Sequence, residues 1–233
     1  MCGRIVQYEG MAVYMEELSP QGELFSGFDA LPINRFNVAP STRVQILRGA
    51  DDGLHIDAVK WGWAPFWAKG KRPDPINARV ETVATGKFFK HLWPDGRALV
   101  PSDGWFEWVK DAENPKLKQP YFIRLKDRSP MFLGALAQVH PGLEPQEGDG
   151  FVIITAASDS GMVDIHDRRP LVLTPDHARE WIQPDLSVVG AEQIAKECCR
   201  PTQDFEWFKV GREVGNVKNQ GPGLIEPLEA PRT

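Results

Sequence analysis

Residues 98–108 read ALVPSDGWFEW, and their apolar and aromatic content predicts an extended strand in the middle of the chain. The same content predicts strands at residues 44–49, 54–64, 121–125, 131–139 and 151–157. Helices are predicted at residues 11–19, 173–183 and 190–199, the second with Thr174 as its N-cap and Pro175 in its first turn. Strands dominate and do not alternate regularly with helices, which predicts an α+β fold rather than a doubly wound α/β sheet.

Length and composition predict one soluble domain. The chain has 233 residues, of which 42% are hydrophobic and 25% are charged, enough for a sizeable core. We expect a single domain over residues 1–226 and a frayed tail over residues 227–233. The sequence shows neither a signal peptide nor an apolar run long enough to span a membrane. Three cysteines, two of them adjacent, do not form a disulfide framework, which indicates a reducing compartment, the cytoplasm or the nucleus.

Charge is distributed unevenly along the chain. The net charge of −5 argues against a protein that binds nucleic acid over its whole surface. Between Lys60 and Arg97, however, eight Lys or Arg residues accompany three acidic residues, a local charge of +5. A phosphate responds to this local potential, so a basic face on an acidic protein stays possible.

Six of the eight tryptophans lie between Trp61 and Trp108, and basic residues are interleaved with them. Aromatic rings stack on unpaired bases and cations follow the backbone in proteins that bind single-stranded nucleic acid. The alternative is that these tryptophans belong to the core and that the basic residues form a solvated loop.

Three motifs carry side chains suited to catalysis. Glu107 lies between two aromatic residues, where the pKa of a carboxyl can rise into the range of general acid–base catalysis; an ordinary surface glutamate is the alternative. His166 can transfer protons near neutral pH, unless it is a structural histidine in a polar loop. Asn77 and Arg79 would share one face of a strand, with Arg79 suited to a phosphate, although an asparagine after Pro-Ile also occurs in turns.

The sequence gives no indication of a metal or a cofactor. Five histidines are scattered, and no Cys or His pair has the spacing of metal ligands. Neither a phosphate loop nor a dinucleotide fingerprint is present. We therefore expect neither metal nor cofactor.

Cys2 follows the initiator methionine, which is normally removed when the second residue is small. Removal of Met1 gives Cys2 a free α-amine beside its thiol, with reference pKa values of about 7.7–8.0 and about 8.5. Both groups are then partly nucleophilic at neutral pH. Spacing alone does not show whether Cys2, Asn77, Glu107 and His166 meet in space.

In this order along the chain, seven motifs resemble the SOS-response-associated peptidase family: MCGR (1–4), RFNVAPST (35–42), WGWAP (61–65), INARVET (76–82), DGWFEW (103–108), VDIHDRRPLVL (163–173) and VGNVKNQG (214–221). The resemblance implies an α+β fold in which mixed, mainly antiparallel strands curl into a partly open barrel with helices outside. It implies a cytoplasmic monomer, associated with the nucleoid when bound to DNA. It also implies that the protein binds single-stranded DNA and captures abasic sites covalently through Cys2.

The family pattern also implies roles for individual residues. Asn77 would orient Cys2 and the sugar, Glu107 would move protons during amine attack and release of Met1, and His166 would act in opening the sugar ring and in reversal. The phosphate contacts would be Arg4, Arg79 and Arg168. The residues that line the DNA groove would be Asn37, Pro40, Trp67, Trp108 and Thr155.

Two other functions compete with a crosslinking enzyme. One is a cysteine peptidase that acts on other proteins, with Cys2 as nucleophile and His166 as base. The other is a non-covalent reader of damaged DNA. The position of Cys2 directly after the initiator favours the crosslinking enzyme, because neither a peptidase nor a reader needs an aminothiol.

Overall fold

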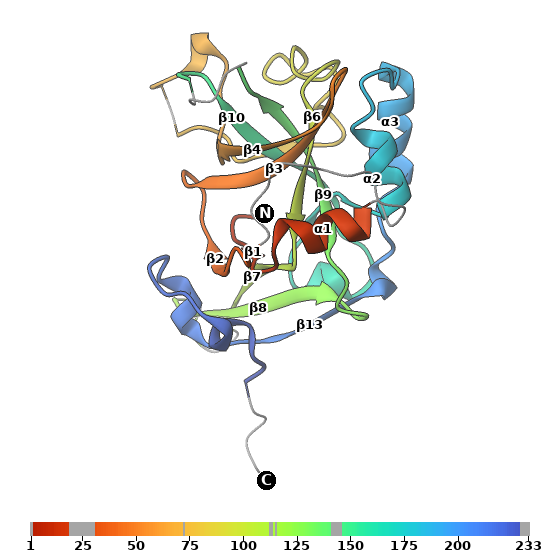
Figure 1. The fold of residues 1–233 in the computed structure, drawn as a ribbon. Coiled ribbons are helices and arrows are strands. Elements are labelled where there is room, and N and C mark those ends of the chain that lie inside the picture. Colours follow the sequence, from red (N-terminus) through yellow and green to blue (C-terminus); the bar gives the residue numbers. More distant parts are fainter. Residues whose placement is uncertain are drawn as a thin grey trace.

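The computed structural model describes residues 2–18, 31–71, 73–111, 114, 116–140 and 146–228. Two sheets face each other across an apolar core (Figure 1). The five-stranded sheet, in the order β13–β8–β7–β1–β2, contains β1 (Ile5–Gln7), β2 (Arg35–Val38), β7 (Gly104–Lys110), β8 (Lys118–Leu125) and β13 (Phe205–Lys209). The eight-stranded sheet contains β3 (Arg43–Ala50), β4 (Gly53–Lys60), β5 (Asn77–Arg79), β6 (Arg97–Ser102), β9 (Met131–Gln138), β10 (Gly150–Ala157), β11 (Arg168–Pro170) and β12 (Val172–Leu173).

The architecture confirms the predicted α+β class. The larger sheet has the order β11–β10–β9–β6–β3–β4, with β12 beside β9 and β5 beside β10. Among the described strands, β5 and β10 form the one parallel ladder, and neither sheet closes on itself. The predicted boundary at residue 226 stays a prediction. Leu228, within the predicted tail, still donates its amide to the Lys209 carbonyl at 2.9 Å, and residues 229–233 lie outside the described residues.

The stretch 98–108 forms two strands, so the prediction of one continuous strand was wrong. β6 pairs with β9 in the larger sheet, whereas β7 pairs with β8 and β1 in the smaller sheet. The chain turns at Asp103, whose Oδ2 accepts hydrogen bonds from Tyr8 N at 2.7 Å, Glu9 N at 3.3 Å and Tyr14 Oη at 2.6 Å. At Gly104 a Cβ atom would lie 2.2 Å from the Phe122 ring, so only glycine permits this close approach. This corner joins the two sheets.

Three helices pack outside the larger sheet: α1 (Met11–Leu18), α2 (Pro175–Trp181) and α3 (Val188–Glu197). Thr174 caps α2 as predicted, because its hydroxyl accepts the His177 amide and Pro175 occupies the first turn. Figure 1 shows α2 and α3 together on one side of this sheet, where Trp181 and Ile194 join its core. In the described part of the chain, no helix has the length and apolar character needed to cross a membrane.

The tryptophan-rich segment divides between the core and the surface. The core interpretation is confirmed for four residues that are at most 6% exposed: Trp61, Trp63, Trp93 and Trp105. Trp67 is 45% exposed and Trp108 is half-buried, so these two rings stay accessible. Arg97 does not belong to the basic face, because it is buried and donates to backbone carbonyls of Trp181 and Gln183.

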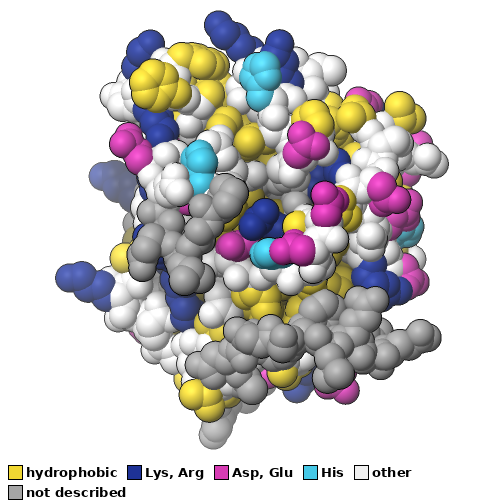
Figure 2. Space-filling model, turned by 45° about the horizontal axis from the view of Figure 1, so that its top comes forward, with side chains coloured by type: hydrophobic (Ala, Val, Ile, Leu, Met, Phe, Trp, Pro, Cys, Tyr) yellow, Lys and Arg dark blue, Asp and Glu magenta, His cyan; other side chains and the backbone are white. Residues whose placement is uncertain are grey.

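Figure 2 shows acidic, basic and histidine side chains intermixed on one face of the molecule. Some basic residues of the segment are already paired, as Lys60 is with Asp74 at 2.9 Å. A nucleic acid would therefore be attracted by individual basic side chains on this face rather than by one continuous positive surface.

The corner at Asp103 generates a stability prediction. Asp103→Ala removes the acceptor for three donors at a buried site, so we expect the free energy of unfolding to fall by about 3 kcal/mol. Urea unfolding at constant m-value measures this loss. Asp52→Ala is the control, because the Asp52 side chain is 75% exposed and pairs with His55 at the surface; it should change stability by less than about 0.5 kcal/mol. Equal midpoints for Asp103→Ala and the unmodified protein would contradict the prediction.

Candidate active site

Cys2 leads into β1, which is paired on both sides. Ile5 lies opposite Trp105 of β7 and opposite Val38 of β2, and the Arg4 carbonyl accepts the Phe106 amide at 2.9 Å. These pairings place Cys2 in the core between the two sheets, with none of its surface exposed. Burial, followed by the charge of Glu107, raises the pKa of the thiol well above its ordinary value. At neutral pH the thiol therefore needs a base to become a thiolate.

Asn77 is in direct contact with the segment that carries Cys2. Its Nδ2 donates to the Cys2 carbonyl at 2.9 Å, and β5 is held by its parallel pairing with β10. The Asn77 Oδ1 atom is buried and receives no hydrogen bond from the described residues. An unpaired buried acceptor is costly, so this oxygen is suited to receive a donor from a bound molecule.

Glu107 lies on β7 and faces the same core as Cys2. Along the strand, Trp105 belongs to the same core cluster as Cys2, while Phe106 and Trp108 pack on the opposite face. Glu107 is 3% exposed, and burial raises its pKa to about 7. A carboxyl with this pKa exchanges a proton readily at neutral pH, as a general acid or base must.

His166 lies in the loop between β10 and β11. The Arg168 amide donates to His166 Nδ1 at 2.9 Å, and the same ring nitrogen lies 2.8 Å from Asp167 Oδ1. Burial lowers the pKa of His166, and the charge of Asp167 opposes this shift. Asp167 also raises the pKa of Glu107, so the loop lies within electrostatic reach of Glu107. The four predicted catalytic residues therefore converge from four separate segments.

Arg168 is engaged with protein partners. Its Nη1 and Nη2 atoms donate to both carboxylate oxygens of Glu81 at 2.6 and 2.9 Å, and Nη2 also contacts the Thr155 carbonyl. The predicted groove residue Thr155 is only 1% exposed. Glu81 was not predicted from the sequence, although it follows Asn77 and Arg79 at the same two-residue spacing. The predicted phosphate contact Arg79 is exposed.

Arg4 forms a second cluster beside Cys2. Its Nη1 donates to Asn37 Oδ1 at 2.6 Å and to the Val214 carbonyl at 2.8 Å, and its guanidinium lies 5.4 Å from the centre of the Trp108 ring. Asn37 is 2% exposed, whereas Pro40, at the turn after β2, is half-buried. The guanidinium of Arg4 therefore lies against the Trp108 ring, and the buried Asn37 accepts a hydrogen bond from Arg4.

Trp67 belongs to a separate aromatic surface. It lies in a short 3₁₀ helix, Phe66–Ala68, in which Phe66 is 89% exposed. Lys87 Nζ lies 4.8 Å above the Trp67 ring, and Phe88 meets the ring edge-on at 5.1 Å. A cation beside accessible rings suits the recognition of stacked bases.

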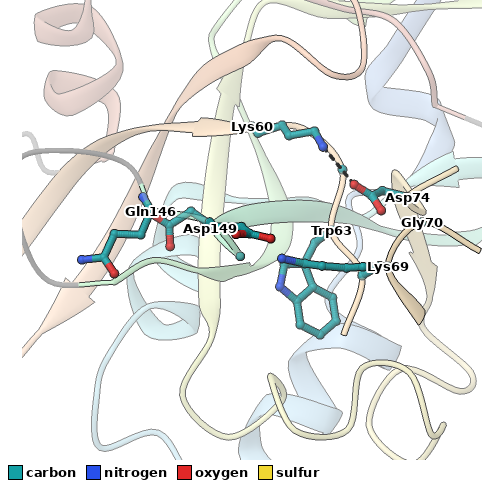
Figure 3. Close-up of a pocket in the computed structure, with 11 residues that line it drawn as sticks. Lys60, Trp63, Lys69, Gly70, Asp74, Gln146 and Asp149 are labelled. Carbon is teal, nitrogen blue, oxygen red and sulfur yellow. Dashed lines mark hydrogen bonds and ion pairs between the residues drawn. The ribbon is translucent and has the colours of Figure 1, made fainter. Parts of the chain in front are cut away.

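A cavity of about 340 Å³ lies at the far end of β4, near the start of β10 (Figure 3). Its walls include Lys60, Trp63, Lys69, Asp74 and Asp149, and none of the predicted site residues. Both aspartates already have protein partners. Asp74 forms an ion pair with Lys60, and Asp149 accepts hydrogen bonds from the backbone amide and the ring of His140. Because the cavity is lined by none of the predicted site residues, the cluster around Cys2 is the better candidate. Among the described residues, no group of His, Cys, Asp and Glu side chains could hold a metal ion.

Burial of Glu107 generates a pH prediction. The folded protein retains the Glu107 proton up to about pH 7, whereas the unfolded chain loses it above about pH 4.5, so stability falls as pH rises between these values. Glu107→Gln removes this penalty and should be more stable than the unmodified protein at pH 8 by up to about 3 kcal/mol. The gain should vanish below pH 4.5. Urea unfolding of both proteins at pH 4.5 and pH 8 measures it, and an equal difference at the two pH values would refute the raised pKa.

Comparisons with known proteins show to which family this chain is similar. A family model described as SOS response associated peptidase (SRAP) matches residues 1–217. The abasic site processing protein YedK of Escherichia coli is 48% identical, over 98% of this chain and 100% of that protein. The abasic site processing protein YoqW of Bacillus subtilis is 29% identical, over 97% and 99% respectively.

A solved structure has the same fold. A phage-related protein of Bordetella bronchiseptica is 38% identical and aligns with a TM-score of 0.78, over 95% of this chain and 100% of that one. The match to the family model covers most of the chain and includes both Cys2 and His166. The chain therefore belongs to the SOS response associated peptidase (SRAP) family.

Proposed function

We propose that the protein processes abasic sites in single-stranded DNA by forming a covalent thiazolidine between the sugar aldehyde and Cys2. The observation that carries the proposal is the placement of Cys2 between Asn77, which holds its carbonyl, and Glu107, whose pKa of about 7 suits proton transfer. Relatives named abasic site processing proteins, in Escherichia coli and Bacillus subtilis, support the same substrate. The residues described above account for the steps without a metal or a cofactor.

The reaction uses both nucleophiles of an N-terminal cysteine. The ring-opened abasic sugar exposes an aldehyde at C1′, to which the Cys2 amine adds; loss of water then leaves an imine. The Cys2 sulfur adds to the imine carbon as its proton leaves, and the nitrogen gains a proton. Closure is intramolecular and therefore fast. The balance is one aldehyde and one aminothiol in, one thiazolidine and one water out.

The chemistry requires a free α-amine on Cys2, and hence removal of Met1, which lies outside the described residues. We include in the proposal that the protein removes Met1 itself: one water hydrolyses the peptide bond between Met1 and Cys2, free methionine leaves, and Glu107 moves the protons. The ionised Glu107 then accepts the proton of the thiol, whose pKa burial has raised. The buried Asn77 Oδ1 is placed to accept a hydrogen bond from the sugar or the amine. His166 serves the sugar hydroxyl during ring opening and reversal.

The DNA strand would contact exposed groups around this cluster. Arg79 and Trp67 are accessible as they stand, and Arg4, Trp108 and the half-buried Pro40 would line one side of the DNA groove. Arg168 keeps Glu81 as its partner and has only its remaining donors for a phosphate. The buried Asn37 and Thr155 act by supporting their neighbours.

Cys2 variants test the proposal directly. With single-stranded DNA that contains one abasic site, Cys2→Ala and Cys2→Ser should form no adduct that survives denaturation, because neither has a thiolate. Non-covalent binding should persist. Intact mass of the unmodified protein should show loss of Met1, and its adduct should equal protein plus DNA minus one water. The control is the double variant Cys198→Ser and Cys199→Ser, which should crosslink normally because these thiols lie elsewhere. An adduct at full yield in Cys2→Ala, or retained Met1 in a competent sample, would overturn the mechanism.

His166 should affect the rate of crosslinking rather than its extent. A residue that moves a proton in a reversible step lowers the barrier in both directions, so His166→Ala should slow formation and release alike, by about 10²–10⁴-fold. The final crosslinked fraction should stay near that of the unmodified protein. Release is measured by adding an excess competitor strand to the crosslinked protein. The control is His55→Ala, because His55 lies at the surface beside Asp52. Unchanged rates in both directions would make His166 a structural residue.

A further inference from the structure

The motif VGNVKNQG, residues 214–221, has no role in the reaction described so far. We infer that residues 214–220 form a positioning loop that fixes the guanidinium of Arg4 for one DNA phosphate, with Gln220 as the anchor of the loop. The inference rests on the proposed function, since it assigns the loop to the DNA-binding side of the same site. It is carried by three sets of contacts: at Asn37, at Gln220 and at Arg4.

Asn37 joins the loop to Arg4. Its Nδ2 donates toward three loop carbonyls, those of Val214 at 3.2 Å, Asn216 at 3.0 Å and Asn219 at 3.0 Å. Its Oδ1 accepts from Arg4 Nη1 at 2.6 Å. The side-chain amide of Asn37, which is 2% exposed, is therefore hydrogen-bonded both to the loop and to Arg4. Any shift of the loop moves this amide and, with it, the acceptor of Arg4.

Gln220 attaches the loop to the edge of the smaller sheet. β2 is the last strand of that sheet, so within the described residues no strand pairs with its other side. The Gln220 side chain takes that place, because its Oε1 accepts the amides of Phe36 at 3.0 Å and Asn37 at 3.1 Å, and its Nε2 donates to the Asn37 carbonyl at 3.1 Å. The three bonds fix the backbone of Asn37 as well as the end of the loop.

Arg4 is thereby held two residues from Cys2. Nη1 is committed to Asn37 and to the Val214 carbonyl, and the guanidinium lies against Trp108. Neither of these hydrogen bonds uses Nη2, which leaves that group for a phosphate oxygen. An arginine held in this way has already lost its rotamer freedom, so binding a phosphate costs less entropy.

Gln220→Ala tests the inference through DNA binding. We expect the dissociation constant for single-stranded DNA without an abasic site to rise about tenfold, because an Arg4 side chain that is no longer held in place does not maintain its phosphate contact. The slope of log affinity against log salt should shrink by about 0.7, the value of one phosphate contact. The crosslinking rate at saturating abasic DNA should stay within about twofold, since no group placed in the chemistry changes. Gln220→Glu keeps the acceptor for both amides but loses the Nε2 donor to the Asn37 carbonyl, so it should show a partial loss of both the affinity and the salt slope.

The control and the double variant separate positioning from general stability. Gln119→Ala is matched, because Gln119 Nε2 also ties the C-terminal part of the chain, through the Val210 carbonyl at 2.9 Å, but does not reach Arg4. It should leave the affinity and the salt slope unchanged. In an Arg4→Gln background, Gln220→Ala should have no further effect on affinity.

Three outcomes would overturn the inference: normal affinity and slope in Gln220→Ala, additive losses in the double variant, or an equal loss in Gln119→Ala. If Gln220→Ala does not fold, as judged by urea unfolding, the same comparisons are made with Gln220→Glu, and a normal salt slope there overturns the inference. Failure of the unmodified protein to bind single-stranded DNA would refute the proposed function instead, so the two failures are distinguishable.

Discussion

The position of Cys2 depends on the pairing of one three-residue strand with two neighbours. β1 lies between β7 and β2, and its antiparallel register with β7 puts Ile5 opposite Trp105. Residues before Ile5 must then run beside residues after Trp105, which carries the start of the chain toward Glu107. A slip of one residue would turn the side chains of β1 to the other face and separate the thiol from the carboxyl. The candidate chemistry is thus set by register more than by any single contact.

Enclosure between the sheets also determines the proton chemistry. Burial raises the pKa of Glu107 to about 7 and lowers that of His166, so the same physical cause favours the uncharged form of both groups, the protonated carboxyl and the neutral imidazole. Burial also makes the Cys2 thiol hard to ionise, which is why a base at hand is needed. The arrangement carries a stability cost, because a buried carboxyl and an unpaired Asn77 oxygen are unfavourable in a folded protein.

The sequence predicted the long strands and the helices better than the short elements that build the site. β3, β8, β9 and β10 are apolar enough to be recognised, whereas β1 and β11 have three residues each and become strands only through distant partners. The bend at Asp103 was missed because it depends on donors from Tyr8 and Tyr14, far away in sequence. Residue types identified the candidate site, but spacing could not show that Asn37 and Thr155 are buried or that Arg168 holds Glu81.

Both ends of the folded chain contribute to one surface. Arg4 bonds the carbonyl of Val214, 210 residues away, and Asn77 bonds Cys2 across 75 residues. Contacts of such separation form only when the sheets are assembled, because closing long loops is entropically unfavourable until many contacts form together. A partly folded chain therefore has the reactive residue without its partners. In the proposed mechanism, the nucleophile Cys2, the proton acceptor Glu107 and the phosphate ligand Arg4 come together at the same step that completes the fold, so the proposed reaction requires the native protein.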